Sequence, residues 1–473
     1  MASSGAVSAA AAVVLAFLAA PPARAGTDWT TFGFDGRRTG YDPQETVIGA
    51  GNVGRLKQAW AADLGGPSLT QPTVATGVSL KGGSRDFVYA GTLEGDLLAF
   101  DRATGATVWK KHLASLKTSC DDFPGGVVGI LGTPTLDRSR HAVYAAAADG
   151  KLHALDEASG AERSGWPVTI APNNKVDFVY GSPTLLGSSV YVETASVCDH
   201  GPYHGQAARV SLSGAPKVTA RWFPVGGSGK PYGGGIWGAG GISSDGSALY
   251  AATGNAIPYG HENAGLAERV VRLSSALKVQ ASNFPNVSGF DVDFGATPLL
   301  YRGKACLAAM NKSGALFVYD PGRIGDGPKQ RLQVGDAGLG DGGNFIGLPA
   351  YDPDHDLVLV NLTTDSSDGP YRSGLVAFRA AADCTLSLAW QRGLVGKGTE
   401  AVQYPSIQPT VANGVVYVVR SNSSRLYALS AATGAVLWDS GGSLRGGVYV
   451  SATVANGQLL AVDYAGRLHA FAP

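Results

Sequence analysis

Four residues in the middle of the sequence have side chains that together could do chemistry on a bound molecule: Trp237, Asn255, Asp293 and Lys312. The indole of Trp237 offers a flat apolar surface for a planar ligand. The amide oxygen of Asn255 suits a hard cation such as Ca²⁺. Asp293 could act as a general base, and the ammonium of Lys312 could stabilise developing negative charge. Brought together, these side chains could form a site where a base acts beside a metal ion.

Each of these residues also has a simpler interpretation. A tryptophan in a glycine-rich chain is more often a packing residue, Asn255 lies in a T-G-N turn, and the segment that follows Lys312 is typical of a turn before a strand. Asp293 has the most distinctive surroundings, D-V-D-F-G, but Asp291 could compete for its role. The prediction therefore depends on the four residues occurring as an ordered set.

The composition indicates many short strands joined by tight turns. Glycine accounts for 67 of the 473 residues, and charged residues make up only 16%. Tight turns need residues that accept positive φ, which glycine does without strain. Lys plus Arg and Asp plus Glu number 37 each, and there is no long run of like charge. Neither nucleic acid nor an anionic membrane surface is therefore expected as a partner.

An internal repeat predicts the architecture. Its core is a glycine or small polar residue followed by an alternating apolar strand, and the fuller copies continue through Asp and T/S-G to a tryptophan. Eight copies occur, most of them 40 to 60 residues apart, which is the spacing of four-stranded propeller blades. They begin at Gly95, Gly150, Gly205, Ala267, Gly314, Ser373, Ser424 and Gly466. In the fuller copies T-G makes the turn, and the tryptophan is expected to fill the gap between blades.

The two ends of the chain predict how the ring closes. The eighth copy stops at Phe471, so its blade lacks a last strand. Residues 56–64 (LKQAWAADL), with Trp60, supply that strand and remove the exposed sheet edges. The predicted fold class is all-β: an eight-bladed β-propeller, residues 26–473, whose last blade is closed by an N-terminal strand. Unrelated β-sandwiches in tandem would not explain a motif that is split between the two ends.

The first 25 residues are interpreted as a cleaved secretory signal. An apolar stretch from Ala9 to Ala20 is followed by Pro21-Pro22 and an A-x-A site that ends at Ala25. About 12 apolar residues are too few for a membrane span, which needs roughly 20. The sequence thus predicts a periplasmic or secreted protein with no membrane anchor.

Four cysteines, at positions 120, 198, 306 and 384, are expected to form two disulfides in an exported chain. Three connectivities are possible from the count alone. The absence of C-x-x-C and C-x-x-C-H argues against a zinc site and against attached c-type haem.

The blade motifs and the central set resemble alcohol dehydrogenases that depend on pyrroloquinoline quinone (PQQ), over nearly the whole mature chain. The resemblance is carried by Gly234-Gly235-Ile236-Trp237-Gly238, Ala252-Thr253-Gly254-Asn255, Asp291-Val292-Asp293-Phe294-Gly295 and Met310-Asn311-Lys312-Ser313-Gly314. It implies that Trp237 and Gly238 bind the quinone and that Asn255 ligates Ca²⁺. It also implies that Asp293 is the catalytic base and a metal ligand, and that Lys312 is hydrogen-bonded to the quinone. Gly295 stands where lanthanide-using relatives carry a carboxylate, which favours calcium.

The sequence departs from this family at two places. The family's calcium is also bound by a Glu from an earlier blade. Here Cys198 or Asp199 aligns with that Glu, and Asp199 could ligate the ion in its place. Glu193 lies too early in the sequence to align with it. The family often has two adjacent cysteines near the quinone, whereas this chain has Cys120 alone, with no arginine nearby. The D-D-F-P stretch after Cys120 is nearest to polyvinyl-alcohol-dehydrogenase-like members.

The resemblance also favours one disulfide pairing. Cys120 and Cys198 fall on loops expected at the cofactor face, which implies a bond between them and leaves Cys306 to pair with Cys384. Each closed loop would contribute about 4 kcal/mol in the chain-entropy model. A disulfide at the pocket edge could stand in for the pair of adjacent cysteines, or it could seal a pocket that has lost its cofactor.

Two functions follow as expectations. The first is a quinoprotein dehydrogenase that oxidises a small or polymeric alcohol with PQQ and Ca²⁺ and passes electrons to a separate acceptor such as a cytochrome. The alternative is a cofactor-free propeller that serves as an extracytoplasmic platform for protein interaction or assembly. A carbohydrate-binding propeller is compatible with the fold but has no positive support.

Overall fold

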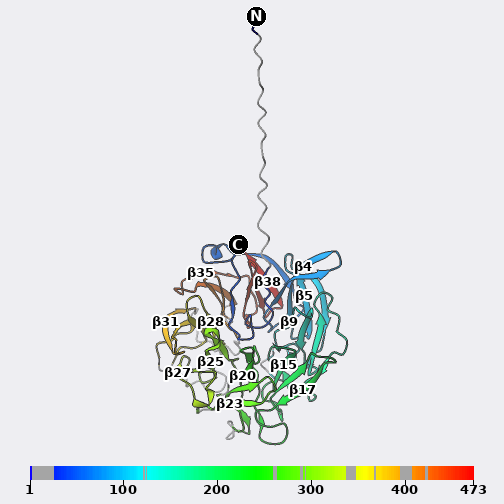
Figure 1. Cartoon of the computed structure of the whole chain (residues 1–473), viewed down its shortest axis with the longest axis vertical. Helices are drawn as coiled ribbons and strands as arrows, with labels where there is room; N and C mark the ends of the chain where they lie inside the picture. Colours follow the sequence, from blue (N-terminus) through cyan, green and yellow to red (C-terminus); the bar gives the residue numbers. More distant parts are fainter. Residues whose placement is uncertain are drawn as a thin grey trace.

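The computed structural model describes residues 1–2, 26–120, 123, 125–258, 264–287, 291–292, 294–336, 348–366, 369–394, 407–420 and 424–473. The strands form eight blades of four antiparallel strands each, and a short fifth strand, β1 or β13, extends two of the sheets. The blades follow one another around a disc as the chain proceeds from blue to red in Figure 1. The first strands of neighbouring blades contact each other around the central axis. The predicted eight-bladed propeller is confirmed.

In each blade the strands run A to D from the axis outwards. The first four blades consist of β3 (Thr73–Leu80), β4 (Gly83–Gly91), β5 (Asp96–Asp101) and β6 (Thr107–His112); β9 (Thr135–Asp137), β10 (Ala142–Ala146), β11 (Lys151–Asp156) and β12 (Val168–Thr169); β14 (Thr184–Leu186), β15 (Ser189–Ala195), β16 (Gln206–Ser211) and β17 (Lys217–Trp222); and β19 (Ser243–Ser244), β20 (Ala248–Ala252), β22 (Val270–Ser274) and β23 (Val279–Asn283).

The remaining blades consist of β24 (Leu299–Tyr301), β25 (Cys306–Met310), β26 (Ala315–Tyr319) and β27 (Gln330–Gln333); β28 (Ala350–Asp352), β29 (Leu357–Leu362), β30 (Gly374–Ala380) and β31 (Leu386–Gly393); β32 (Thr410–Ala412), β33 (Val415–Arg420), β34 (Arg425–Ser430) and β35 (Val436–Asp439); and β36 (Thr453–Ala455), β37 (Gln458–Asp463), β38 (Arg467–Ala472) and β2 (Lys57–Asp63). The apolar strand of each repeat copy is the C strand of its blade.

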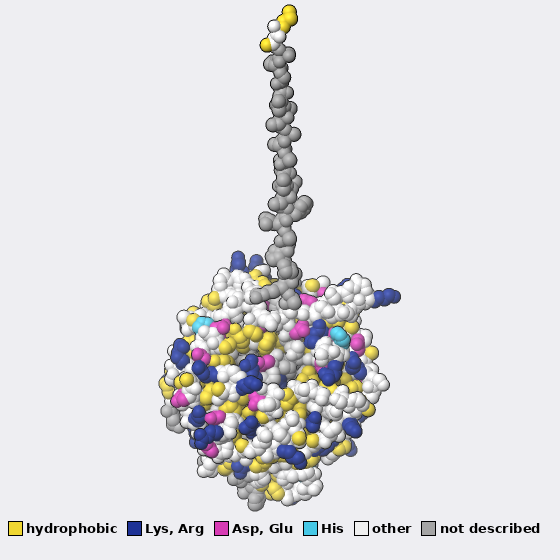
Figure 2. Space-filling model, in the orientation of Figure 1, with side chains coloured by type: hydrophobic (Ala, Val, Ile, Leu, Met, Phe, Trp, Pro, Cys, Tyr) yellow, Lys and Arg dark blue, Asp and Glu magenta, His cyan; other side chains and the backbone are white. Residues whose placement is uncertain are grey.

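Short elements occupy the connections. The strands are β1 (Tyr41–Asp42), β7 (Leu116–Lys117), β8 (Val127–Val128), β13 (Phe178–Val179), β18 (Tyr232–Gly233) and β21 (Ala256–Ile257), and the 3-10 turns are Val53–Arg55, Arg302–Lys304 and Ile324–Asp326. Among the described residues, no helix is both long and apolar enough to pass through a bilayer. Figure 2 shows acidic and basic side chains interspersed over the visible face.

The antiparallel order of the strands gives the disc two distinct faces. The connections between B and C strands, and those from a D strand to the next A strand, emerge on one face, here called the BC face. The A–B and C–D connections emerge on the other, here called the AB face. Each chemical group can therefore be assigned to a face from the connection that carries it.

The ring is closed by the N-terminal strand, as expected from the split motif. Strand β2 pairs antiparallel with β38, with Lys57 opposite Ala472 and Asp63 opposite Arg467. A bulge near Trp60 shifts the register by one residue. The eighth blade thus takes its outer strand from one end of the chain and its three inner strands from the other.

The tryptophans of the repeat join each blade to the next. An indole Nε1–H on an outer strand donates to a backbone carbonyl of the neighbouring blade in four cases: Trp60 to Arg102, Trp109 to Glu157, Trp390 to Ala431 and Trp438 to Leu56. For Trp60, Trp109 and Trp390, the ring lies against the glycine of the neighbour's T-G or S-G turn. A Cβ added at Gly160 would lie 2.7 Å from the ring of Trp109. The glycine therefore supplies both the positive φ and the space for the indole.

We expect Gly160→Ala to destabilise the protein by about 1–3 kcal/mol, because it adds a left-handed alanine and a steric clash with Trp109. Gly187→Ala is the matched control, since Gly187 also has positive φ but its added Cβ would meet nothing within 4 Å. Denaturant unfolding of both variants measures the difference. Equal losses of unfolding free energy in the two variants would show that the packing of the Trp109 indole does not require a glycine at position 160.

Hydroxyl groups at the start of the A strands connect the blades around the axis. Thr135 donates to the carbonyl of Pro183 at 2.7 Å, and Thr453 donates to the carbonyl of Pro72 at 2.6 Å. Thr184 and Thr410 make the same kind of bond to the blade that follows. These bonds satisfy buried polar groups at the inner circumference, where no water is needed to do so.

The segment before β2 lies against the inner strands on the AB face. Backbone hydrogen bonds join residues 29–40 to the A strands of blades 1, 2, 4, 5, 6 and 7, ending with the amide of Val411 on the carbonyl of Gly40. The side chain of Asn456, in the A–B turn of blade 8, holds the backbone of Thr27. This arrangement was not foreseen from the sequence.

Candidate functional site

Three of the predicted site residues lie in connections on the BC face. Trp237 is in the connection from β17 to β19, Asn255 follows β20, and Lys312 lies in the turn between β25 and β26. They belong to blades 4 and 5, which are neighbours. Asp293, in the connection from β23 to β24, lies outside the described residues, so its place in the site remains a prediction.

Trp237 and Lys312 are brought together. The Lys312 ammonium nitrogen lies 5.1 Å from the centroid of the Trp237 ring, within range of a cation–π interaction. The same ammonium donates to Oδ1 of Asp291 at 2.6 Å, and both side chains are only 13–15% exposed. The half-buried indole therefore has a cation over its face, and a carboxylate fixes that cation. Asp291 was considered only as a competitor for the role of Asp293, and its ion pair was not foreseen.

The tryptophan is positioned by the end of strand β15. The amide of Ile236 donates to the carbonyl of Thr194, and the amide of Tyr180 donates to the carbonyl of Glu193. Tyr180 then meets the Trp237 ring edge to face, with centroids 6.2 Å apart. One strand end thus holds the indole and the aromatic side chain beside it.

Asn255 and Gly238 lie in close-packed surroundings. Asn255 is 2% exposed, and its side-chain nitrogen has no hydrogen-bond partner among the described residues. Its backbone carbonyl accepts from Gly234, which ties it to the segment that carries Trp237. A Cβ at Gly238 would lie 2.5 Å from Oγ1 of Thr297, so no larger residue fits there without movement.

Asp199 lies farther out on the same face, in the connection from β15 to β16. Its carboxylate accepts a hydrogen bond of 2.8 Å from the hydroxyl of Tyr203. Tyr203 stacks edge to face on Tyr232 of β18, which pairs with β21 directly after Asn255. Asp199 is therefore linked to the Asn255 region through two tyrosines, and its role as a metal ligand remains a prediction.

The described residues fit a flat anionic ligand better than they define a metal site. An indole face with an ammonium over it suits an aromatic ring system that carries negative charge. For a metal ion, the described part of the chain contributes the buried side chain of Asn255. In that part, no group of three or more His, Cys, Asp or Glu side chains is arranged to hold a metal ion. A calcium site would need Asp293 to complete it.

Two buried ionisable residues whose proximity was not foreseen, Glu193 and Arg38, lie in the hub. Glu193, on β15, is fully buried; the amide of Ile242 faces its carboxylate, but no hydrogen bond with acceptable geometry forms among the described residues. Burial raises the pKa of Glu193 to about 8, although the charge of Arg38 acts in the opposite direction. The only signal in the sequence was a glutamate within the otherwise uncharged strand SVYVETA.

Arg38 enters this region from the N-terminal segment. Its guanidinium donates to Oγ1 of Thr31, the carbonyl of Phe32 and Oγ1 of Thr184, at 2.6–3.0 Å. Burial lowers its pKa to about 10. Through Thr184, Arg38 therefore joins the N-terminal segment to blade 3, close enough to Glu193 for its charge to act on that carboxyl group.

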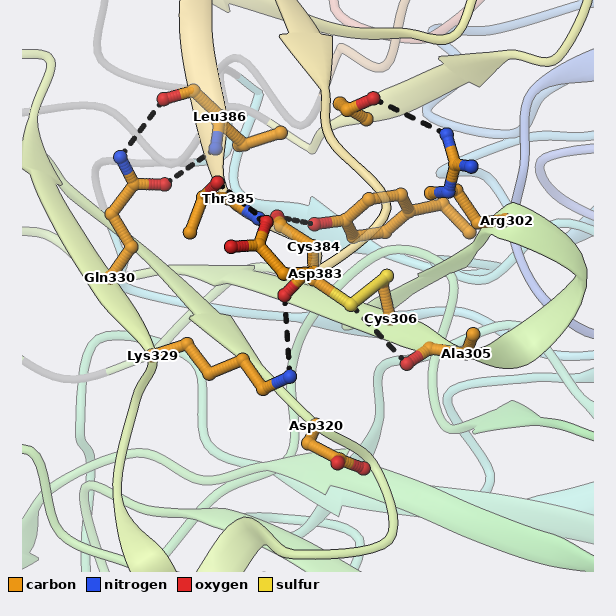
Figure 3. Close-up of a disulfide and its surroundings, with 12 residues drawn as sticks. Arg302, Ala305, Cys306, Asp320, Lys329, Gln330, Asp383, Cys384, Thr385 and Leu386 are labelled. Carbon is orange, nitrogen blue, oxygen red and sulfur yellow. Dashed lines mark hydrogen bonds between the residues drawn. A yellow bond between two sulfur atoms is a disulfide. The ribbon is translucent and has the colours of Figure 1, made fainter.

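The four cysteines form the two expected disulfides, Cys120–Cys198 and Cys306–Cys384. The first lies on the BC face, between the connection from β6 to β9 and the connection from β15 to β16. The second lies on the AB face, where Cys306 begins β25 and Cys384 lies in the turn between β30 and β31 (Figure 3). The disulfide pairing is confirmed.

Two sequence profiles match parts of the chain. The family described as "Glucose/ethanol/alcohol dehydrogenase, beta-propeller domain" matches residues 29–184, and "Outer membrane protein assembly factor BamB" matches residues 375–473. Neither range includes Trp237, Asn255, Asp293 or Lys312. The profiles therefore identify the repeat and say nothing about the candidate site.

Two curated relatives are similar in sequence. Quinohemoprotein alcohol dehydrogenase of Comamonas testosteroni is 27% identical over 267 residues, which are 50% of this chain and 34% of that protein. Polyvinylalcohol dehydrogenase of a Pseudomonas species is 24% identical over 340 residues, or 63% of this chain and 50% of that protein. The matches thus span between a third and a half of these relatives.

Solved structures share the fold. The quinohemoprotein alcohol dehydrogenase from Comamonas testosteroni superposes with a TM-score of 0.69 at 18% identity, over 94% of this chain and 80% of that one. A europium-containing methanol dehydrogenase gives a TM-score of 0.71 at 14% identity, over 94% and 98%. BamB from Moraxella catarrhalis gives 0.57 at 15% identity, over 88% and 100%.

Proposed function

Because the chain belongs to the PQQ-repeat β-propeller family, we propose that it is an exported quinoprotein dehydrogenase that oxidises an alcohol with PQQ and Ca²⁺. The observation that carries the proposal is the indole of Trp237 with the ammonium of Lys312 over its face, fixed by Asp291. Two disulfides in the described structure support an oxidising compartment, in agreement with the signal peptide predicted at residues 1–25.

Each residue has a distinct part in the proposed reaction. Trp237 forms the floor on which the quinone stacks, with Gly238 leaving room beside it. Asn255 and Asp293, with Asp199 as a third candidate, hold the calcium ion. When bound, PQQ supplies a two-electron acceptor and Ca²⁺ polarises its reacting carbonyl. Asp293 takes the hydroxyl proton of the alcohol, and Lys312 hydrogen-bonds a quinone oxygen and stabilises the charge that develops there.

Small and polymeric alcohols are both possible substrates, and electrons leave to a separate acceptor such as a cytochrome. The described B–C and D–A connections around Trp237 carry aromatic side chains, among them Tyr180, Tyr203 and Tyr232. Substrate choice is expected to depend on these connections, because they lie on the same face as Trp237 and surround it.

Reconstitution tests the proposal. The purified protein is titrated with PQQ in the presence of Ca²⁺ and then assayed by dye reduction with a panel of alcohols, including polyvinyl alcohol. We expect saturable binding and alcohol-dependent dye reduction. Binding that is absent at millimolar Ca²⁺ would overturn the proposal.

We expect Lys312→Met to weaken PQQ binding by about 10- to 100-fold, because a hydrogen bond to a charged group contributes roughly 1.5–3 kcal/mol. Lys329→Met is the control: Lys329 lies in the connection between β26 and β27 on the AB face, where its ammonium contacts the carbonyl of Asp383. Equilibrium titration of both variants gives the comparison. Equal affinities for PQQ would remove Lys312 from the site.

A second candidate is a cofactor-free platform for protein assembly. It is favoured by the BamB profile over residues 375–473 and by the shared fold with BamB from Moraxella catarrhalis. The ion pair of Lys312 with Asp291 beside Trp237 has no evident purpose in such a platform. Failure of PQQ binding in the titration would favour this candidate.

A further inference from the structure

We propose that the Cys120–Cys198 disulfide is a positioning element of the cofactor site, whereas Cys306–Cys384 stabilises the fold without affecting that site. This inference rests on the proposed function for its consequence in PQQ binding. Its structural part, the ordering of two segments on the BC face, can be tested without the cofactor.

The first step concerns what the Cys120–Cys198 bond joins. Cys120 lies in the connection that runs from blade 1 to blade 2, and Cys198 lies in the B–C connection of blade 3. The bond therefore ties two long connections that share no strand pairing. The next residue after Cys198 is Asp199, and both residues have positive φ, so this backbone is in a conformation that local sequence alone does not favour.

The second step links the disulfide to Trp237. Cys120 is buried in an apolar cluster on the BC face with Phe123, Phe178 and Val197, and Tyr180 packs against the same cluster. The rings of Tyr180 and Trp237 meet edge to face. A series of packed side chains thus connects the disulfide to the indole. Movement of the disulfide would therefore displace the indole, because closely packed side chains transmit strain.

The third step links the disulfide to Asn255. The loop after Cys198 contains Tyr203, whose hydroxyl donates to Asp199 and whose ring contacts Tyr232. A Cβ at Gly201 would lie 2.5 Å from the ring of Tyr232, so this loop is tightly packed against β18. Strand β18 pairs with β21, which follows Asn255. The disulfide therefore restrains the first part of the loop whose later part contacts β18 and, through it, the Asn255 region.

The second disulfide lies where the blades are already held together. Figure 3 shows Cys306–Cys384 beside Gln330, whose side-chain amide makes two hydrogen bonds to the backbone of Leu386, at 2.6 and 2.9 Å. The hydroxyl of Tyr301 also donates to the carbonyl of Cys384 at 2.7 Å. These bonds keep the turn in place when the disulfide is absent.

The two disulfides make an unusually well-matched comparison, because each spans 78 residues. In the chain-entropy model, loops of equal length restrict the unfolded chain equally. A difference between the two variants in cofactor affinity or local exchange therefore reports on where each bond lies in the native structure.

The test compares the wild type with Cys120→Ala/Cys198→Ala and Cys306→Ala/Cys384→Ala. Amide hydrogen exchange in the cofactor-free proteins is followed over residues 196–205 and 231–241. We expect exchange at least tenfold faster in both segments for the first variant and unchanged exchange for the second, with lower unfolding midpoints in both. PQQ titration with Ca²⁺ should then give at least tenfold weaker binding for the first variant only.

Unchanged exchange in the first variant, or the same change in both variants, would overturn the inference. A wild type that does not bind PQQ would overturn the proposed function, while the exchange result would still decide whether the disulfide orders the two segments. If the first variant does not fold, dithiothreitol treatment of the folded wild type replaces it. In that experiment dithiothreitol reduces the bond of the exposed Cys198 to Cys120 and is itself oxidised to its cyclic disulfide. Mapping of the alkylated thiols then confirms which bond was reduced.

Discussion

Replacing Asp293 with asparagine is expected to lower kcat for alcohol oxidation by about 10²- to 10⁴-fold, which is the usual contribution of a general base. Asparagine keeps an oxygen that can ligate calcium, so PQQ binding should change little. Steady-state kinetics on the reconstituted protein, with binding measured separately, would distinguish loss of the base from loss of the cofactor.

Asp291→Asn is the matched control for this variant. The two aspartates are two residues apart, but the carboxylate of Asp291 is engaged by Lys312 at 2.6 Å. Asp291 has a φ of 52°, which asparagine tolerates, so the backbone should be unaffected. We expect Asp291→Asn to weaken PQQ binding through Lys312 and to leave most of kcat. A larger loss of kcat in Asp291→Asn than in Asp293→Asn would show that Asp291, and not Asp293, is the general base.

Glu193→Gln is expected to remove a dependence of stability on pH that the wild type shows between about pH 4.5 and 8. The pKa of Glu193 is about 8 in the folded protein and roughly 4.3 in an unfolded chain. Because the folded state holds this proton more tightly, its contribution to stability is complete below pH 4 and is lost as the pH rises toward 8. The loss amounts to on the order of 4 kcal/mol, at about 1.4 kcal/mol per pH unit.

Glutamine remains neutral, so the variant should be more stable than the wild type at pH 8 and similar to it at pH 5. Denaturant unfolding at the two pH values gives both free energies. Glu94→Gln, at an exposed position in the B–C turn of blade 1, is the control. If the wild type and Glu193→Gln lose stability equally between pH 5 and 8, then Glu193 is charged in the native state, paired with Arg38.

The repeat and its closure were predictable because they depend on local chemistry. Alternating apolar residues define each C strand, a positive-φ glycine makes the turn, and the tryptophan follows at a fixed distance. Trp60 could be recognised as the missing piece of the eighth blade by the same pattern. The cysteine pairing came from the family resemblance, since the count alone allowed three connectivities.

The contacts that define the hub were decided only by the tertiary structure. The ion pair of Asp291 with Lys312 joins residues 21 positions apart, in two different connections. The approach of Arg38 to Glu193 joins the N-terminal segment to blade 3. The backbone hydrogen bonds of residues 29–40 to six inner strands leave no mark on the sequence, because any residue with an amide and a carbonyl can make them. Local patterns therefore determined the blades, whereas closing the ring determined which side chains share the space at its centre.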